Sequence, residues 1–409
     1  MPRPFDRDRD RSDLIRIWGD VGWKKGQPDF ERGIDAYMGA CDTIVEDHDG
    51  VMEVGASRTP GVLHVQGNTL PMVIIAGVYA GVVCRQGGHA STLTALQVAA
   101  GVADGAAVAT LGIFDQGFYD RLGFGSGPYV RRMTIEPTSL KVAKLDRSPV
   151  RLSVDDAAEM HACRLGRRRM HGMVDITDAR LTELECCEAP GHGLGFRSAD
   201  GEMTHALWIC VDENAGDGPW SVRWMAWSTR AQLHELLGVI RSFADQISGV
   251  RIADPPGVQL QDLVDRPFAW LRRTRGGENY GKPTSIAYQQ HRICDVPACM
   301  AALSLPGESL SFNLQLHDPI EGFLPQDAPW RGCAGDWTVT LGDTCSAMAG
   351  RAEGLPVLEA SVNAFTRLWL GARSAEALAL TDELHGDDDL LGALTARWLL
   401  PEPAADWDY

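Results

Sequence analysis

The residues best suited to chemistry gather in the turn Arg85-Gln86-Gly87-Gly88-His89-Ala90. The turn follows an apolar run at residues 74–83, which predicts a buried strand, and it leads into a helical pattern at residues 89–100. Small residues let the backbone come close to a ligand. Unpaired N–H groups at the helix start, the helix dipole and the charge of Arg85 would together hold a pyrophosphate. An ordinary strand-to-helix connection is the alternative interpretation.

A second group of such residues follows another apolar run at residues 106–114, and it reads Phe118-Tyr119-Asp120-Arg121-Leu122-Gly123-Phe124. A tyrosine phenol, with an ordinary pKa of about 10, keeps its proton at neutral pH and can donate it to a leaving group. Its alternative role is that of a core aromatic. The two groups lie on consecutive elements, so we expect a strand, a turn, a helix and a second strand to position them around one site.

The order of these elements, with the spacing Arg-x-x-Gly-x-Ala and then Phe-Tyr-x-x-x-Gly-Phe, resembles the core of the GNAT superfamily of N-acetyltransferases. The hairpin pattern at residues 62–72, the segment Gly117-Phe118-Tyr119 and the C-terminus narrow the resemblance to the Eis (enhanced intracellular survival) family. The segment Arg292-Ile293-Cys294-Asp295-Val296-Pro297-Ala298 looks like the start of that family's third domain, and residues 365–372 and 399–409 look like its end.

The resemblance implies an α+β fold with tandem GNAT domains, each a mixed sheet flanked by helices, followed by an α/β domain resembling sterol carrier proteins. We therefore expect a catalytic domain at residues 1–148, a second GNAT-like domain without the cofactor turn at residues 149–284, and the third domain at residues 285–409. Fold does not carry function, and with no long apolar channel evident in the third domain we assign it no lipid.

The resemblance also implies direct transfer of an acetyl group from acetyl-CoA to an amine. Tyr119 matches the general acid, and the carboxylate of the terminal residue Tyr409 matches the general base. The neighbouring Asp408 is assigned to the substrate site, and its charge, with burial, would raise the low pKa of that carboxylate. The residues expected to bind the cofactor are Val78, Tyr79, Ala80, Arg85, Gln86, Gly87, Gly88, His89, Ala90, Phe114 and Asp115.

The turn departs from the family pattern, in which several arginines precede the glycine. Gln86 and Gly87 occupy those positions, and the proline expected just upstream is missing from Val82-Val83-Cys84. The CoA phosphates are therefore less well matched in charge, and a longer acyl donor stays open. The resemblance implies aminoglycosides among the amine substrates and a homohexameric assembly. Polyamines or another amine are equally compatible with the sequence.

Composition agrees with a multidomain protein of the cytoplasm. The chain has 409 residues, and no stretch resembles a signal peptide or a membrane span. Its ten cysteines form neither a secreted disulfide pattern nor paired zinc motifs, so we predict free thiols and no metal. A formal net charge of −17 argues against nucleic acid as a partner and suits a cationic substrate.

Several other segments carry structural expectations. The alternating charges of residues 1–13 predict a frayed start, with Ser12 or Asp13 capping the first helix. The run Arg164, Arg167, Arg168 and Arg169 is interpreted as a solvated or domain-bridging face. A strand at residues 129–135 should close the first domain, and residues 191–195 should form a loop. Three aromatics, Trp18, Trp23 and Tyr37, are expected in the core or in a substrate cleft.

Two other function classes fit the sequence. The altered turn suits a non-catalytic protein that keeps the fold and binds a ligand, for which absence of CoA binding would be diagnostic. The lack of any clue to a small substrate suits a protein lysine or Nα-acetyltransferase. Turnover of small amines without turnover of peptides would exclude that second class.

Overall fold

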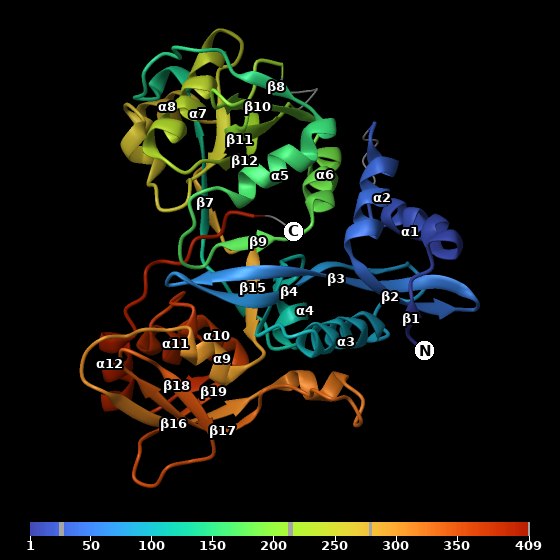
Figure 1. Ribbon diagram of the computed structural model, residues 1–409, viewed down its shortest axis with the longest axis vertical. Coiled ribbons are helices and arrows are strands. Elements are labelled where there is room, and N and C mark those ends of the chain that lie inside the picture. Colours follow the sequence, from blue (N-terminus) through green and yellow to red (C-terminus); the bar gives the residue numbers. More distant parts are fainter. Residues whose placement is uncertain (24–27, 212–215, 278–279, 408–409) are drawn as a thin grey trace.

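Three mixed sheets of eight, seven and five strands form the framework of the protein, so the fold is α+β. They are seen in a computed structural model that describes residues 1–23, 28–211, 216–277 and 280–407. Figure 1 shows the first sheet in the middle of the molecule, with the second and third sheets on opposite sides of it. Within the described residues, no helix has the length and apolar character needed to cross a membrane.

The first sheet carries the predicted cofactor turn and has the strand order β1-β2-β3-β4-β5-β15-β6, with β9 pairing beside β3. Its strands are β1 (Arg3–Pro4), β2 (Asp42–His48), β3 (Val51–Val65), β4 (Asn68–Ala80), β5 (Val108–Gly112), β6 (Gly125–Ser126), β9 (Val174–Ile176) and β15 (Gln289–Ile293). Its helices are α1 (Arg7–Asp20), α2 (Phe30–Ala40), α3 (His89–Ala103) and α4 (Gln116–Asp120). The strand, turn, helix and strand predicted around residues 74–112 are all present.

The second sheet has the order β14-β7-β13-β12-β11-β10-β8. Its strands are β7 (Val130–Ile135), β8 (Val150–Leu152), β10 (Gly191–Arg197), β11 (Met203–Cys210), β12 (Trp220–Ala226), β13 (Val250–Ala253) and β14 (Thr284–Ile286). The helices around it are α5 (Ala157–Leu165), α6 (Ala179–Glu188), α7 (Arg230–Ser242) and α8 (Pro267–Arg273). The loop predicted at residues 191–195 is part of β10. Its glycines fit because a Cβ at Gly191 would lie only 1.9 Å from the Ile209 carbonyl oxygen on β11.

The third sheet has the order β18-β17-β16-β19-β20. Its strands are β16 (Leu310–His317), β17 (Gly335–Leu341), β18 (Ser346–Ala349), β19 (Val357–Ser361) and β20 (Leu384–His385). Four helices accompany it: α9 (Val296–Ala301), α10 (Val362–Trp369), α11 (Ala375–Thr381) and α12 (Asp388–Arg397). A short 3-10 helix, η5 (Pro319–Phe323), follows β16 directly.

Sheet pairing does not follow the domain boundaries expected at residues 148 and 284. The strand predicted to close the first domain, β7, pairs with β13 and β14 in the second sheet. In exchange β15, which comes after the second domain in the chain, lies between β5 and β6 of the first sheet. All five residues of β15 are buried. Strand partners so distant in sequence leave no local signal, which is why a partition by chain order misses the exchange.

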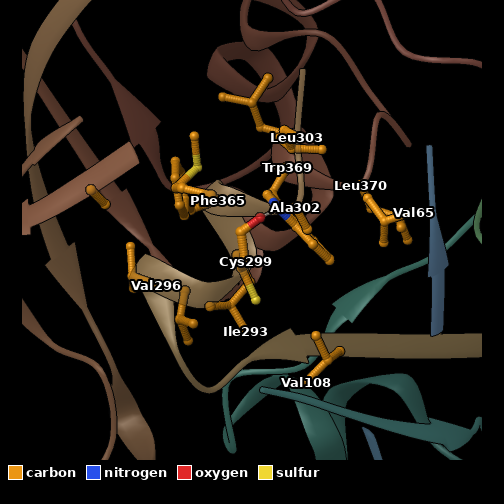
Figure 2. Packing of buried hydrophobic residues seen from close by; sticks show 14 of the residues in the cluster. Val65, Val108, Ile293, Val296, Cys299, Ala302, Leu303, Phe365, Trp369 and Leu370 are labelled. Carbon is orange, nitrogen blue, oxygen red and sulfur yellow. Dashed lines mark hydrogen bonds between the residues drawn. The ribbon is translucent and has the colours of Figure 1, made fainter. Parts of the chain in front are cut away.

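The first and third sheets share one hydrophobic core. Side chains of β3, β4 and β5 meet those of α9, α10 and the third sheet in a single cluster of buried residues. Figure 2 shows Val65 and Val108 from the first sheet facing Cys299, Phe365 and Trp369. The indole N–H of Trp369 donates to the Cys299 carbonyl oxygen at 2.9 Å, so the one polar atom of this side chain is satisfied. The third sheet, with α9 and α10, therefore packs directly against the first sheet.

The N-terminus is ordered, contrary to the expectation of a frayed start. Arg3 donates to Asp10 at 2.6 Å and to Asp47 at 2.5 Å, and Asp10 is fully buried. The cap of α1 is Asp6, whose carboxylate accepts from the N–H groups of Asp8 and Arg9. Arg3 and Arg9 thus pair with Asp47 on β2, and Arg7 and Arg11 pair with Asp35 on α2.

We predict that the fold loses stability as pH falls from about 6.5 to 4, partly through His291 on β15. Its two ring nitrogens have no hydrogen-bond partner among the described residues, and burial lowers the pKa of His291 to about 4. The unfolded chain therefore takes up this proton at a higher pH than the folded protein. Replacing His291→Leu should lower the pH slope of the unfolding free energy in that window by about 1.4 kcal/mol per pH unit.

Urea unfolding at several pH values measures this slope. The exposed His385→Leu serves as the control and should leave the slope unchanged. An equal slope in His291→Leu and the native protein would show that His291 is not buried in its neutral form.

Candidate active site

A groove of about 940 Å³ runs along the end of β4, the following turn and the start of α3. Every residue expected to bind the cofactor lines it: Val78, Tyr79, Ala80, Arg85, Gln86, Gly87, Gly88, His89, Ala90, Phe114 and Asp115. Tyr119 lines the same groove. The structure therefore brings the two predicted groups of residues together, while their roles stay predictions.

The groove exists because β4 and β5 pair for only part of their length. Their parallel pairing runs from Met72 opposite Val108 to Ile75 opposite Leu111 and then stops, although β4 continues to Ala80. At this point the pairing of β3 with β4 also shifts register, and a bulge of this kind strengthens the local twist. On the β5 side, the last residues of β4 thus meet no described strand. Their alternate N–H and C=O groups are available to an amide-bearing chain.

The turn after β4 fits an anion. Gln86 and Gly88 have positive φ values of 66° and 79°. Gly88 is the N-cap residue of the 15-residue helix α3. No side chain caps this helix start and no acidic residue lies in its first turn, so its N–H groups face the groove unpaired by protein. A Cβ at Gly87 would lie 2.6 Å from the ring of His89, so a larger residue at this position would displace the imidazole.

His89 is held beside the turn by Glu46 on β2. The His89 Nδ1 atom lies 3.0 Å from Glu46 Oε2, and the N-terminal ammonium lies 3.2 Å from the other carboxylate oxygen. Burial alone would raise the pKa of Glu46, but these two hydrogen bonds hold it below its usual range. Glu46 therefore stays ionised and fixes the orientation of the imidazole.

Tyr119 lies on the short helix α4 and lines the same groove as the turn. Its ring meets Phe118 edge-on at 4.9 Å and Phe124 at 6.2 Å, and the side chain is 6% exposed. Burial, and then the negative charge of Asp115, raise the pKa of Tyr119 to about 12. The phenol is thus both fixed in position and protonated at neutral pH.

A second cavity of about 390 Å³ adjoins the groove and shares Trp23 and Phe114 with it. Its aromatic walls are Trp18, Trp23, Tyr37, Phe114 and Tyr288, and its charged residues are Arg132, Glu185, Glu188 and Arg223. Trp18 and Tyr37 are also buried core residues whose ring centroids lie 5.1 Å apart, so the core interpretation is confirmed for these two. The substrate cleft stays a prediction. Phe114, at the junction, is 78% exposed.

The C-terminal tail reaches this second cavity. Trp407 is 1% exposed, and its carbonyl oxygen accepts a hydrogen bond of 2.7 Å from Gln289 Nε2, a residue of the cavity wall. The guanidinium of Arg164 lies 3.9 Å from the centre of a Trp407 ring, and that of Arg167 lies 4.9 Å away. A desolvated cation over an indole is a favourable contact of about 2 kcal/mol. The two residues beyond Trp407, Asp408 and Tyr409, lie outside the described residues.

The arginine run was predicted as a solvated or bridging face, and the structure separates its members. Arg164 and Arg167 are buried and paired, Arg164 with Glu185 and Arg167 with Asp175 and Asp406. Arg168 and Arg169 are exposed. Because Asp406 is 239 residues from Arg167, sequence reasoning had no means of finding this anchor of the tail.

Comparison with solved structures gives full-length matches. A probable N-acyltransferase from Enterococcus faecalis V583 has a TM-score of 0.79 and 18% identity, covering 100% of this chain and 99% of that one. A GCN5-related N-acetyltransferase from Kribbella flavida has a TM-score of 0.71 and 17% identity, covering 100% and 98%. Eis1 from Mycobacterium abscessus has a TM-score of 0.74 and 16% identity, covering all of both chains.

The chain has the same fold as these three structures. No protein-family model and no curated protein matches the sequence. Identities of 16 to 18% establish the shared fold, and they leave the substrate open.

Among the described residues that line the groove, two are arginines. The turn itself contributes Arg85, whose side chain is exposed and has no salt bridge to any described residue. The second is Arg121, a residue that sequence reasoning did not assign to the site. Its position directly after the tyrosine helix was the available signal.

We predict that Trp407→Ala releases the tail and destabilises the protein by about 3–5 kcal/mol, the usual cost of truncating a large buried aromatic. Urea unfolding and the rate of carboxypeptidase digestion at neutral pH measure the two effects. Leu399→Ala, a 74% exposed residue of the same tail, is the control and should alter neither. Native digestion rates in Trp407→Ala would mean that the arginines do not hold the tail.

Proposed function

We propose that this protein is an acetyl-CoA-dependent N-acetyltransferase that acts on primary amines. The observation that carries the proposal is the open edge of β4 beside the uncapped start of α3, with the protonated phenol of Tyr119 in the same groove. Named N-acetyltransferases share the fold over the whole chain, which agrees with this assignment. A groove that offers backbone groups, a helix N-terminus and a proton donor suits transfer from a thioester.

Each part of the groove has a role in the proposed reaction. Acetyl-CoA supplies the acyl group as a thioester. Backbone groups of Val78, Tyr79 and Ala80 bind the amide-bearing arm, and one of their N–H groups stabilises negative charge on the carbonyl oxygen. The start of α3 and Arg85 bind the diphosphate. Tyr119 Oη holds the proton that the departing sulfur requires.

The proton of the attacking amine must leave on the other side, and we assign this step to the carboxylate of Tyr409. Trp407 is fixed at the wall of the second cavity, and two further residues span at most about 7 Å, so the terminal group can reach that cavity. Such a carboxylate ordinarily has a pKa of about 3.5, a poor match for an amine. Burial in the cavity and the charge of Asp408 would both raise it.

The second cavity is the proposed acceptor site. It adjoins the groove at Phe114, and its aromatic walls and carboxylates suit an ammonium or a neutral amine. Polyamines and aminoglycosides are the proposed substrate classes, and the net charge of −17 would draw such cations toward the protein. A homohexamer in the cytoplasm, and a sterol-carrier type for the third domain, belong to the same proposal.

The first prediction concerns the base. Extending the chain by two glycines past Tyr409 should reduce amine-dependent thiol release from acetyl-CoA by at least about tenfold, since the carboxylate is displaced. Tyr409→Phe keeps a terminal carboxylate at the same place and is the matched control, which should retain most activity. Unchanged turnover in the extended chain would remove Tyr409 from the mechanism. Absence of thiol release with every amine, despite CoA binding, would favour a binding protein instead.

The second prediction concerns the acid. Tyr119→Phe should lower the turnover number by about a hundredfold, within the range for loss of a general acid, with little change in the KM for acetyl-CoA. The phenyl ring preserves the contacts with Phe118 and Phe124. Tyr129→Phe, at a 50% exposed tyrosine outside the groove, is the control. Because the pKa of Tyr119 is about 12, the native rate should show no loss from this group between pH 7 and 10.

A further inference from the structure

Two residues outside the edge of β4 and the α3 turn also line the groove, Arg121 and Phe323. Arg121 directly follows α4, and its guanidinium carbon lies 5.2 Å from the centre of the Phe118 ring. Phe323 is the last residue of η5 and comes from the third domain. Arg121 also lines a separate hollow of about 1030 Å³ between the first and third domains, which places it at the border of the two.

The positive charges of the groove come from two separate elements. Among its described lining residues, the arginines are Arg85 at the turn and Arg121 directly after α4. Arg121 is exposed, and no described carboxylate lies within salt-bridge distance of it. An acyl-CoA carries two separate groups of negative charge, the diphosphate and the 3′-phosphate of the ribose. The α3 start and Arg85 suit the first group, and Gln86 and Gly87 leave the turn without a cation for the second.

Phe323 adds an aromatic surface beside Arg121. The side chain is half-buried and packs in the same cluster as Phe118 and Trp330. Its helix is capped by Asp318, which is buried and ion-paired with Arg292 at 2.6 Å, so Phe323 is held by a rigid part of the third domain. A fixed aromatic ring next to a cation is the arrangement that proteins use to bind a purine base together with its phosphate.

We propose that Arg121 binds the 3′-phosphate of CoA and that Phe323 contacts its adenine ring, so that the third domain forms part of the cofactor site. This inference rests on the proposed function, because it takes the groove to bind an acyl-CoA. It assigns the two arginines to different phosphates. Arg121 thereby supplies the charge that the turn lacks.

Isothermal titration of CoA and of 3′-dephospho-CoA separates the two arginines. Arg121→Gln should weaken CoA binding about tenfold or more, the usual effect of losing a hydrogen bond to a charged group, and should leave 3′-dephospho-CoA within about twofold. Arg85→Gln, the matched control, should weaken both ligands by the same factor. Phe323→Leu, which preserves apolar packing, should weaken both ligands but leave 4′-phosphopantetheine binding unchanged. Native melting temperatures in all three variants confirm folding.

The outcomes distinguish the inference from the function on which it rests. Equal weakening of both ligands by Arg121→Gln, or no weakening, would overturn the assignment of the 3′-phosphate while CoA binding stands. Unchanged binding in Phe323→Leu would remove the third domain from the site. If the native protein binds neither ligand at millimolar concentration, the proposed function itself fails.

Discussion

The ion pair between Arg292 and Asp318 joins the parts of this protein on which the site depends. Both side chains are fully buried, and Asp318 accepts from Arg292 at 2.6 Å and from the Cys333 N–H at 2.9 Å. Arg292 lies on β15 and also donates to the Leu122 carbonyl oxygen, close to Tyr119. Removing one partner would leave a buried charge, at a cost of about 3–5 kcal/mol. These contacts therefore fix the first sheet, the third domain and the groove relative to one another.

The strand that carries this arginine also links the two halves of the proposed chemistry. On one side of β15, Gln289 donates to the Trp407 carbonyl oxygen and so holds the tail. Its neighbour Gln290 donates to Asp120 at 2.6 Å, next to the tyrosine of α4. Successive residues of a strand point to opposite faces, so one short strand supports the acid side and the base side together. In the chain, β15 comes after all the strands of the second sheet. The first sheet is therefore completed by a strand that lies beyond the second sheet in sequence.

Sequence alone can predict the features that depend on residues close together in the chain. The apolar run before Arg85 and the small residues after it predict the strand, the turn and the helix that line the groove. The features that were missed depend on distant partners. Arg164 and Arg167 are buried because Glu185 and Asp406 meet them, and neither spacing nor charge pattern within the run shows this. The strand exchange escaped prediction for the same reason.

In the proposed reaction, the place where the groove and the second cavity meet determines where the acyl group can be transferred to the amine. They share Trp23 and Phe114, so a group held in the groove and an amine held in the second cavity can react only at this junction. The groove relies largely on backbone atoms and a helix start, which many sequences can provide. The second cavity relies on side chains. The fold that this chain shares with Eis1 at 16% identity therefore does not fix the amine. In the proposed reaction, a substitution in the aromatic walls would change the acceptor without disturbing β4 or α3.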